Sequence, residues 1–230
     1  MFERLFSKQH QRKRALAKAP AGVMRDYLTA PFPSSKTPCT ELEIVSLDLE
    51  TTGLKPKQDS ILSIGLVNIR ALQIHLDTAW HRVIRVEQQI PESSAVIHQI
   101  TDDHAAAGIP LEEALPQLLR QLSGKVMLAH YKSIEQNFLD AACQRLYGTP
   151  FIIPIIDTLE LAQRLFAQRN HSIQPGDLRL FNLRPRYNLP HYKAHNALSD
   201  ALATAELFLA MAAEMAPRPA QCRLDQFQTD

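Results

Sequence analysis

Residues 44–53 read Ile-Val-Ser-Leu-Asp-Leu-Glu-Thr-Thr-Gly, an apolar strand pattern that ends in two carboxylates and a turn. Successive side chains of a strand point to opposite faces, so Asp48 and Glu50 share a face. Two like charges this close raise each other's pKa unless a cation lies between them. Taken alone, the pair is better explained as the polar face of an edge strand. Gly53 permits a tight turn that brings the backbone close to a ligand, which favours a site at the end of this strand.

The elements around this strand predict an α/β fold. Strands are expected over 42–49, 61–69, 78–86, 125–129 and 151–156, and helices over 111–122, 134–147, 158–168 and 194–215. Short connections make the first three strands an antiparallel meander. The order of strands and helices then predicts a mixed sheet, with parallel strands after the meander and helices on both faces.

Two later segments add acidic residues. Glu135 falls in the first turn of the helix that follows the strand at 125–129, where a carboxylate could simply complement the helix dipole. Asp200 lies among alanines on the last long helix, and a charge is costly to bury there unless it ligates or pairs. His195 precedes it by five residues, and a lone histidine at a helix start is usually structural.

Together these segments resemble the DnaQ-like 3′–5′ exonucleases, the superfamily of the replicative proofreading subunit, RNase T and oligoribonuclease. The family pattern Asp-x-Glu-Thr-Thr-Gly is matched from Asp48 to Gly53, and His-x-Ala-x-x-Asp-Ala is matched from His195 to Ala201. Residues 98–101, His-Gln-Ile-Thr, are similar to the family's His-Gly-Ile-Thr. The resemblance covers about residues 42–212 and implies an RNase H-like fold. The histidine spacing indicates the DEDDh branch, in which His is the fifth catalytic residue.

The resemblance also implies a set of site residues. Asp48, Glu50, Glu135 and Asp200 would be catalytic ligands of two Mg²⁺ or Mn²⁺ ions, with His195 as general base. Thr51 and His98 would contact the terminal nucleotide. Glu135 departs from the family pattern, which has Asp at this position; this leaves open a differently tuned metal site or an inactive relative. The competing acidic candidate is Asp140, which lies well off the face of Glu135 on an α-helix.

The function expected from the resemblance is metal-dependent hydrolysis of nucleic acid, with DNA favoured, from a free single-stranded or frayed 3′ end to nucleoside 5′-monophosphates. One alternative is a weakened or inactive nucleic-acid-binding module, and the other is an exoribonuclease of short RNA. A loop with Arg179, Arg184, Arg186 and Tyr187 is expected to bind phosphates upstream, since Arg pairs with phosphate and Tyr stacks on bases.

Composition adds the wider context. The 230 residues include 25 Lys and Arg, 24 Asp and Glu, 45% hydrophobic residues and only 7 glycines, which exclude disordered and collagen-like classes. No apolar stretch approaches the roughly 18–20 residues needed to span a bilayer, which excludes a membrane-spanning class. Three cysteines match no metal-ligand spacing and, with a charged N-terminus unlike a signal peptide, indicate the reducing cytoplasm. No membrane partner is expected.

The charge is distributed unevenly. Residues 1–36 carry eight basic and two acidic side chains, a net charge of +6, and the remainder has a net charge of −5. We therefore expect a basic helical N-terminal arm with a Pro-rich linker over 1–40, an exonuclease domain over 41–216 and a short tail over 217–230. The arm could attract a polyanion, bind a protein partner or be a solvated helical face.

Overall fold

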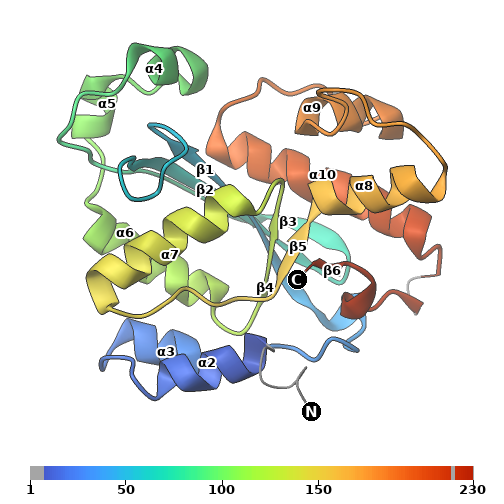
Figure 1. The fold of residues 1–230 in the computed structure, drawn as a ribbon, viewed down its shortest axis with the longest axis horizontal. Helices are drawn as coiled ribbons and strands as arrows, with labels where there is room; N and C mark the ends of the chain where they lie inside the picture. Colours follow the sequence, from blue (N-terminus) through green and yellow to red (C-terminus); the bar gives the residue numbers. More distant parts are fainter. Residues whose placement is uncertain (1–7, 219–220, 230) are drawn as a thin grey trace.

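The computed structural model describes residues 8–218 and 221–229, apart from the side chains of Ser93, Ile97 and Thr229. Figure 1 shows a central sheet with helices on both of its faces. The strands are β1 (Glu43–Thr51), β2 (Ile61–Arg70), β3 (Gln73–Val83), β4 (Val126–Ala129), β5 (Ile155–Asp157) and β6 (Gln228–Thr229). The first seven residues of the expected helical arm lie outside the described residues.

The sheet has the order β3-β2-β1-β4-β5-β6. β1, β2 and β3 form an antiparallel meander, β4 pairs parallel with β1, and β5 pairs parallel with β4. The predicted mixed sheet is therefore confirmed. The sixth strand, β6, lies antiparallel to β5 and was not predicted, because two residues in a tail carry no periodic pattern.

The helices pack against both faces of this sheet. They are α2 (Lys8–Leu16), α3 (Val23–Thr29), α4 (Glu92–His98), α5 (Asp102–Ala106), α6 (Leu111–Leu122), α7 (Ser133–Tyr147), α8 (Thr158–Gln168), α9 (Leu180–Leu183) and α10 (Ala197–Met215), with 3₁₀ turns η1 (Cys39–Glu41), η2 (Arg184–Tyr187) and η4 (Leu224–Gln226). No described helix is long and apolar enough to cross a membrane.

Alternation along β1 sends its side chains into two separate cores. Leu47 and Leu49 join α3, α6 and α7 on one face, whereas Ile44 joins α8 and α10 on the other. The leucines of α6 recur at helical spacing, and the four from Leu115 to Leu122 are fully buried, as their pattern predicts. With helices on both faces, β2 is buried along almost its whole length.

The N-terminal helices α2 and α3 lie against the sheet domain. The Tyr27 hydroxyl donates to the carbonyl oxygen of Ile152 at 2.8 Å, and the Tyr27 ring stacks on Phe151. The buried Arg12 guanidinium donates to three carbonyl oxygens at the end of α3, those of Leu28, Thr29 and Ala30. Part of the basic segment is therefore built into the fold.

Candidate active site

The first two carboxylates lie on the face of β1 that is turned toward α10. Ser46 shares this face, and its hydroxyl donates to the carbonyl oxygen of Ala201 in α10 at 2.6 Å. Asp48 and Glu50 follow at alternate positions on the same strand. The strand therefore directs both carboxylates toward the beginning of α10.

A glycine on the neighbouring strand lets α10 approach this closely. Gly65 lies opposite Asp48 in the β1–β2 pair. A Cβ at Gly65 would lie 2.2 Å from the Ala197 carbonyl carbon and from the Leu198 backbone nitrogen. Only a residue without a side chain fits here, so the first turn of α10 lies directly on the strand beside Asp48.

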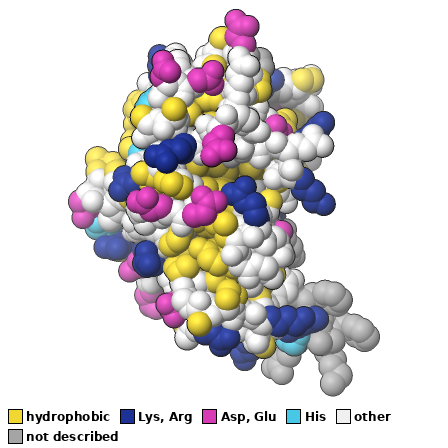
Figure 2. Space-filling view, turned by 90° about the vertical axis from the view of Figure 1, so that its left-hand side faces the viewer, with side chains coloured by type: hydrophobic (Ala, Val, Ile, Leu, Met, Phe, Trp, Pro, Cys, Tyr) yellow, Lys and Arg dark blue, Asp and Glu magenta, His cyan; other side chains and the backbone are white. Residues whose placement is uncertain are grey.

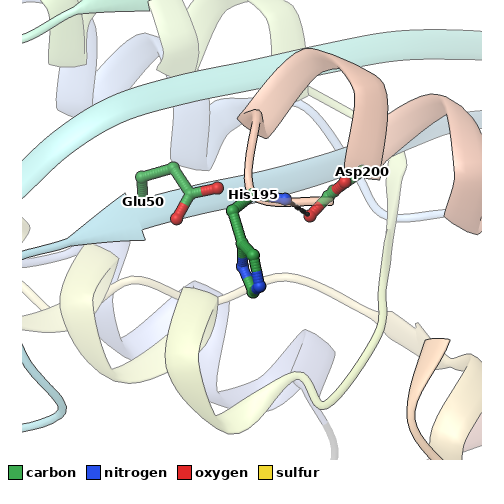
Figure 3. A group of neighbouring side chains, drawn as sticks. All are labelled: Glu50, His195 and Asp200. Carbon is green, nitrogen blue, oxygen red and sulfur yellow. Dashed lines mark hydrogen bonds between the residues drawn. The ribbon is translucent and has the colours of Figure 1, made fainter. Parts of the chain in front are cut away.

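The start of α10 carries the third carboxylate and the histidine. Asp200 Oδ2 accepts a hydrogen bond from the His195 backbone N–H at 3.0 Å, and His195 has a left-handed backbone with φ of 67°. Asn196 caps the helix by accepting from Ser199 N–H. Figure 3 shows Glu50 from β1 beside His195 and Asp200, and ligand atoms of these three residues lie within 4.8 Å of one another.

The fourth carboxylate comes from the first turn of α7. Glu135 is only 2% exposed, and its Oε2 atom makes no hydrogen bond within the described residues. The competing residue Asp140 faces elsewhere, since its carboxylate accepts from the Phe151 backbone N–H at 3.0 Å. Glu135, rather than Asp140, is therefore the acidic residue of α7 that joins the cluster.

Burial makes all four groups weaker acids, and repulsion between carboxylates adds to this effect for Asp48, Glu50 and Glu135. Burial, with a smaller contribution from neighbouring Asp157 and Glu50, raises the pKa of Glu135 to about 8 although nearby backbone N–H groups oppose the shift. Burial and then Asp200 raise the pKa of Glu50 to about 7. Burial raises the pKa of Asp200 to about 6 against the lowering effect of the His195 N–H. Burial, followed by repulsion from the other three carboxylates, also raises the pKa of Asp48.

This donor set fits divalent cations. Hard cations such as Mg²⁺ take carboxylate oxygens as ligands. Two buried oxygens of the cluster, Glu135 Oε2 and Asp200 Oδ1, make no hydrogen bond within the part of the chain that the structure describes. A cation would satisfy both oxygens and offset the repulsion among the buried carboxylates.

Thr51 and His98 are joined through a residue that the sequence did not point to. Ser94 on α4 donates its hydroxyl hydrogen to the Thr51 carbonyl oxygen at 3.1 Å and forms a 2.7 Å hydrogen bond with His98 Nε2. His98 Nδ1 accepts from the Ile100 N–H at 3.2 Å. Burial, followed by the nearby His195, lowers the pKa of His98. The structure therefore places His98 near the cluster with both ring nitrogens engaged.

The expectation that Arg184 binds phosphate is wrong. Arg184 is 1% exposed. It donates to the carbonyl oxygens of Ala203 and Pro190 and forms an ion pair with Glu206 at 2.6 Å. Tyr192 lies under the guanidinium and donates to the same carboxylate at 2.7 Å. Arg184 therefore fastens the segment leading to His195 onto α10, a role with no signal in the sequence.

Two further residues of that loop, Arg186 and Tyr187, also contact acidic side chains of the protein itself. Arg186 pairs with Asp177 at 3.4 Å, and the Tyr187 hydroxyl donates to Glu214 at 3.0 Å. The segment is not a continuous loop either, because it contains α9 and η2.

An open groove of about 1470 Å³ lies beside the β1–β2 connection, between residues 54–61, residues 84–88 and α7. Figure 2 shows hydrophobic side chains gathered across the middle of the corresponding side of the molecule, with charged groups around them. The charged lining residues are Lys55, Lys57, Arg85 and Arg145 and, of opposite sign, Asp59, Glu87, Glu112 and Asp140. The two signs balance, so the groove shows no preference for a polyanion.

The sheet order and the carboxylates around its first strand define an RNase H-like nuclease domain. The exonuclease family that includes RNase T matches residues 45–208, and the chain belongs to this family. The resemblance to DnaQ-like exonucleases is confirmed.

Two relatives illustrate the range of the family. The chain is 34% identical over 165 residues to a DNA polymerase III PolC-type of Thermotoga petrophila, covering 72% of this chain and 11% of the relative. It is 30% identical over 177 residues to the DNA polymerase III subunit epsilon of Treponema pallidum, covering 77% of this chain and 80% of the relative. The chain thus spans about a tenth of the PolC-type protein.

Solved structures share the fold. The nuclease domain of 3′hExo, a DEDDh family member bound to rAMP, superposes with a TM-score of 0.67 at 15% identity, covering 84% of this chain and 99% of that one. Escherichia coli exonuclease I bound to single-stranded DNA gives 0.65 at 16% identity, with coverage of 78% and 42%. Exonuclease X with 5′-overhanging duplex DNA gives 0.58 at 24% identity, with coverage of 80% and 98%. The RNase H-like fold is therefore confirmed.

Proposed function

We propose that this protein is a 3′–5′ exonuclease that removes nucleoside 5′-monophosphates from the free 3′ end of a nucleic acid, with DNA as the favoured substrate. The observation that carries the proposal is the meeting of Asp48, Glu50, Glu135 and Asp200 beside His195, with two buried oxygens left without partners in the described residues. Membership of the exonuclease family supports it.

The four carboxylates would hold two Mg²⁺ or Mn²⁺ ions. When bound, such a pair stabilises the attacking and leaving oxygens of a phosphodiester displacement. The chain supplies the arrangement: β1 presents Asp48 and Glu50, α7 presents Glu135, and α10 presents Asp200. Burial keeps these ligands close together and limits their exposure to bulk water.

His195 would act as general base, taking the proton of the attacking water as the water oxygen bonds to phosphorus and the bond to the 3′ oxygen breaks. An imidazole suits this step near neutral pH. The His195 side chain is exposed, a ring nitrogen lies within 4.8 Å of carboxylate oxygens of Glu50 and Asp200, and the His195 backbone N–H is fixed by Asp200. Thr51 and His98, which Ser94 joins, would lie near the terminal nucleotide.

The choice of substrate rests on the relatives. Those named above include DNA polymerase III proteins, and two of the similar structures hold single-stranded or overhanging DNA. We extend this to an unpaired 3′ end here. A cytoplasmic location and a protein partner for the N-terminal segment stay predictions.

The test uses 5′-labelled DNA and RNA oligonucleotides, incubated with Mg²⁺ or with EDTA. We expect a ladder that shortens from the 3′ end, release of 5′-monophosphates and no product in EDTA. His195→Ala should lower turnover by roughly 10²–10⁴-fold, the usual contribution of a general base. Faster hydrolysis of short RNA would favour the exoribonuclease alternative. Binding without hydrolysis would favour the inactive module, and full activity in EDTA would contradict the proposed chemistry.

A further inference from the structure

Tyr131 is an aromatic residue in an unusual backbone conformation. It lies in the link between β4 and α7 with φ of 69°, in the left-handed region. Side chains with bulk rarely adopt this region, which Gly, Asn and Asp enter more readily. The side chain is 51% exposed, so packing in the core does not account for the choice of tyrosine. Such backbone outliers cluster at functional sites.

The residues around Tyr131 hold this conformation rigidly. The Asp157 carboxylate at the end of β5 accepts from the backbone N–H groups of Tyr131 at 2.9 Å and Lys132 at 3.0 Å. His130 Nδ1 forms a 2.8 Å hydrogen bond with the Thr158 hydroxyl, and Lys132 pairs with Glu160 at 2.9 Å. Both neighbours are thus tied to the start of α8, and the ring between them stays in solvent.

The position is at the same end of the sheet as the carboxylate cluster. β1 and β4 are adjacent and parallel, with Ser46 opposite Leu128. Asp48 and Glu50 follow Ser46 on β1 as Tyr131 follows Leu128 after β4, so all three lie at the same end of the sheet. Glu135 is four residues further on, and its carboxylate interacts with Asp157, which also holds Tyr131.

An exposed ring beside a site for phosphate suits a nucleobase. The Tyr131 side chain makes no hydrogen bond or ring contact within the described residues, so its faces are open to a ligand. Bases stack on aromatic side chains irrespective of sequence, provided that they are not already stacked in a duplex. We propose that the Tyr131 ring is a platform for one unpaired base of the strand whose 3′ end lies at the carboxylates. The inference rests on the proposed function and names the part of the substrate that is bound.

The first experiment compares binding by two variants. Tyr131→Phe keeps the ring, whereas Tyr131→Asn keeps a residue that tolerates the left-handed backbone but removes the ring. Fluorescence anisotropy with a 5′-labelled single-stranded DNA in Ca²⁺, with the strand checked to remain intact, gives the dissociation constants. We expect the Phe variant to bind as the wild type does and the Asn variant to bind roughly tenfold more weakly. Leu76→Asn, at another exposed apolar side chain, should leave binding unchanged.

The second experiment identifies the contact itself. A series of oligonucleotides carries one abasic nucleotide at successive positions from the 3′ end. At the stacked position, loss of the base should weaken wild-type binding about tenfold and should weaken Tyr131→Asn binding no further. Equal losses in both proteins at every position would overturn the proposal.

A third variant tests the proposal even if Tyr131→Asn does not fold. In Tyr131→Trp the new indole should be quenched on addition of single-stranded DNA, after subtraction of the signal of Trp80 measured in the wild type. Unchanged emission at saturating DNA would contradict stacking. If the wild type hydrolyses DNA and the Tyr131 variants bind DNA as tightly as the wild type does, only this inference is disproved. A stacking pattern without hydrolysis would disprove the proposed function alone.

Discussion

Burial raises the pKa of Glu135 to about 8, that of Glu50 to about 7 and that of Asp200 to about 6. The unfolded chain has carboxyl pKa values near 4, so the folded protein keeps protons that the unfolded chain has lost. In metal-free protein this contribution to stability is complete below about pH 4 and is lost as the pH rises to about 8. We expect the metal-free unfolding temperature to fall by roughly 10 °C or more from pH 5 to pH 8.

Thermal unfolding followed by circular dichroism in EDTA measures this pH dependence. Mg²⁺ binds deprotonated ligands, so it should raise the unfolding temperature more at pH 8 than at pH 5. Glu135→Gln removes one of the raised pKa values and should flatten the metal-free profile. A Mg²⁺ effect of equal size at both pH values would contradict a carboxylate metal site.

Glu135 gives a second prediction at this scale. Glu135→Ala should lose most activity and one bound ion, because it removes a buried carboxylate whose Oε2 has no partner in the described residues. Glu135→Asp should keep a measurable fraction, since the shorter side chain retains the charge. Asp140→Asn is the control, because that carboxylate accepts from a backbone N–H away from the cluster. Calorimetric titration with Mg²⁺ counts the ions; loss of an ion only in the Asp140 variant would show that the alignment is wrong.

At the residue scale, three acidic residues of the cluster stand out because each breaks an apolar pattern, whereas Glu135 is indicated by the resemblance to a family motif. Asp48 and Glu50 interrupt a strand, and Asp200 interrupts a row of alanines. The residues that the sequence does not reveal act through contacts between distant segments. Ser94 and Gly65 look unremarkable in sequence, and only the fold brings them to Thr51 and α10.

Among the elements, the segment before α10 depends on one buried ion pair. Arg184→Lys keeps a charge but cannot reach Glu206 and the carbonyl oxygens of Ala203 and Pro190 together. Disruption of a buried pair of this kind should cost about 2–4 kcal/mol of unfolding free energy. Arg186→Lys is the matched control two residues away, at a more exposed pair with Asp177. Equal unfolding free energies of the two variants in urea would contradict the anchoring role.

The contact between α10 and β2 depends on Gly65. Gly65→Ala places a Cβ 2.2 Å from the first turn of α10 and must displace this helix with Asp200 and His195. A displacement near 1 Å is expected to lower activity roughly 100-fold and to weaken Mg²⁺ binding. In Gly148→Ala the added Cβ meets no atom within 4 Å, so α10 is not displaced. The φ of +60° at this position means that the substitution strains only the end of α7. Comparable Mg²⁺ affinities in the two variants would argue against this role of Gly65.

The sequence predicts the long elements well and the short ones poorly. The helices at 111–122 and 158–168 begin and end where their periodicity indicates. The third strand begins at Gln73 rather than near residue 78, because Ala71 and Leu72 form the turn in left-handed conformations without the usual Asn or Gly. The helices α4 and α5 were missed because they are too short to show a periodic pattern of apolar residues.

For the whole molecule, the predicted division into arm, domain and tail stays a prediction, although the described ends pack onto the sheet. Met24, Tyr27 and Leu28 are buried in the same core as α6, and β6 extends the sheet from the tail. Composition cannot reveal this, because a basic segment of mixed sequence looks the same whether it is free or docked. Deletion of residues 1–30 would therefore remove part of the core, so the role of the charge requires substitutions.

The remaining prediction concerns these charges. Lys13, Arg14 and Lys18 are exposed on and just after α2. If they contact phosphates, each contact releases a counterion, and the salt dependence of binding to a single strand steepens by about 0.7 per contact. Replacing all three with Gln should lower the slope of log affinity against log salt by up to about 2 and leave turnover at saturation unchanged. The matched control replaces Lys36, Arg70 and Arg218, three exposed basic residues outside α2 and α3. Equal slopes in the two triple variants would mean that net charge alone sets the salt dependence. An unchanged slope in the α2 variant would favour a protein partner for this face.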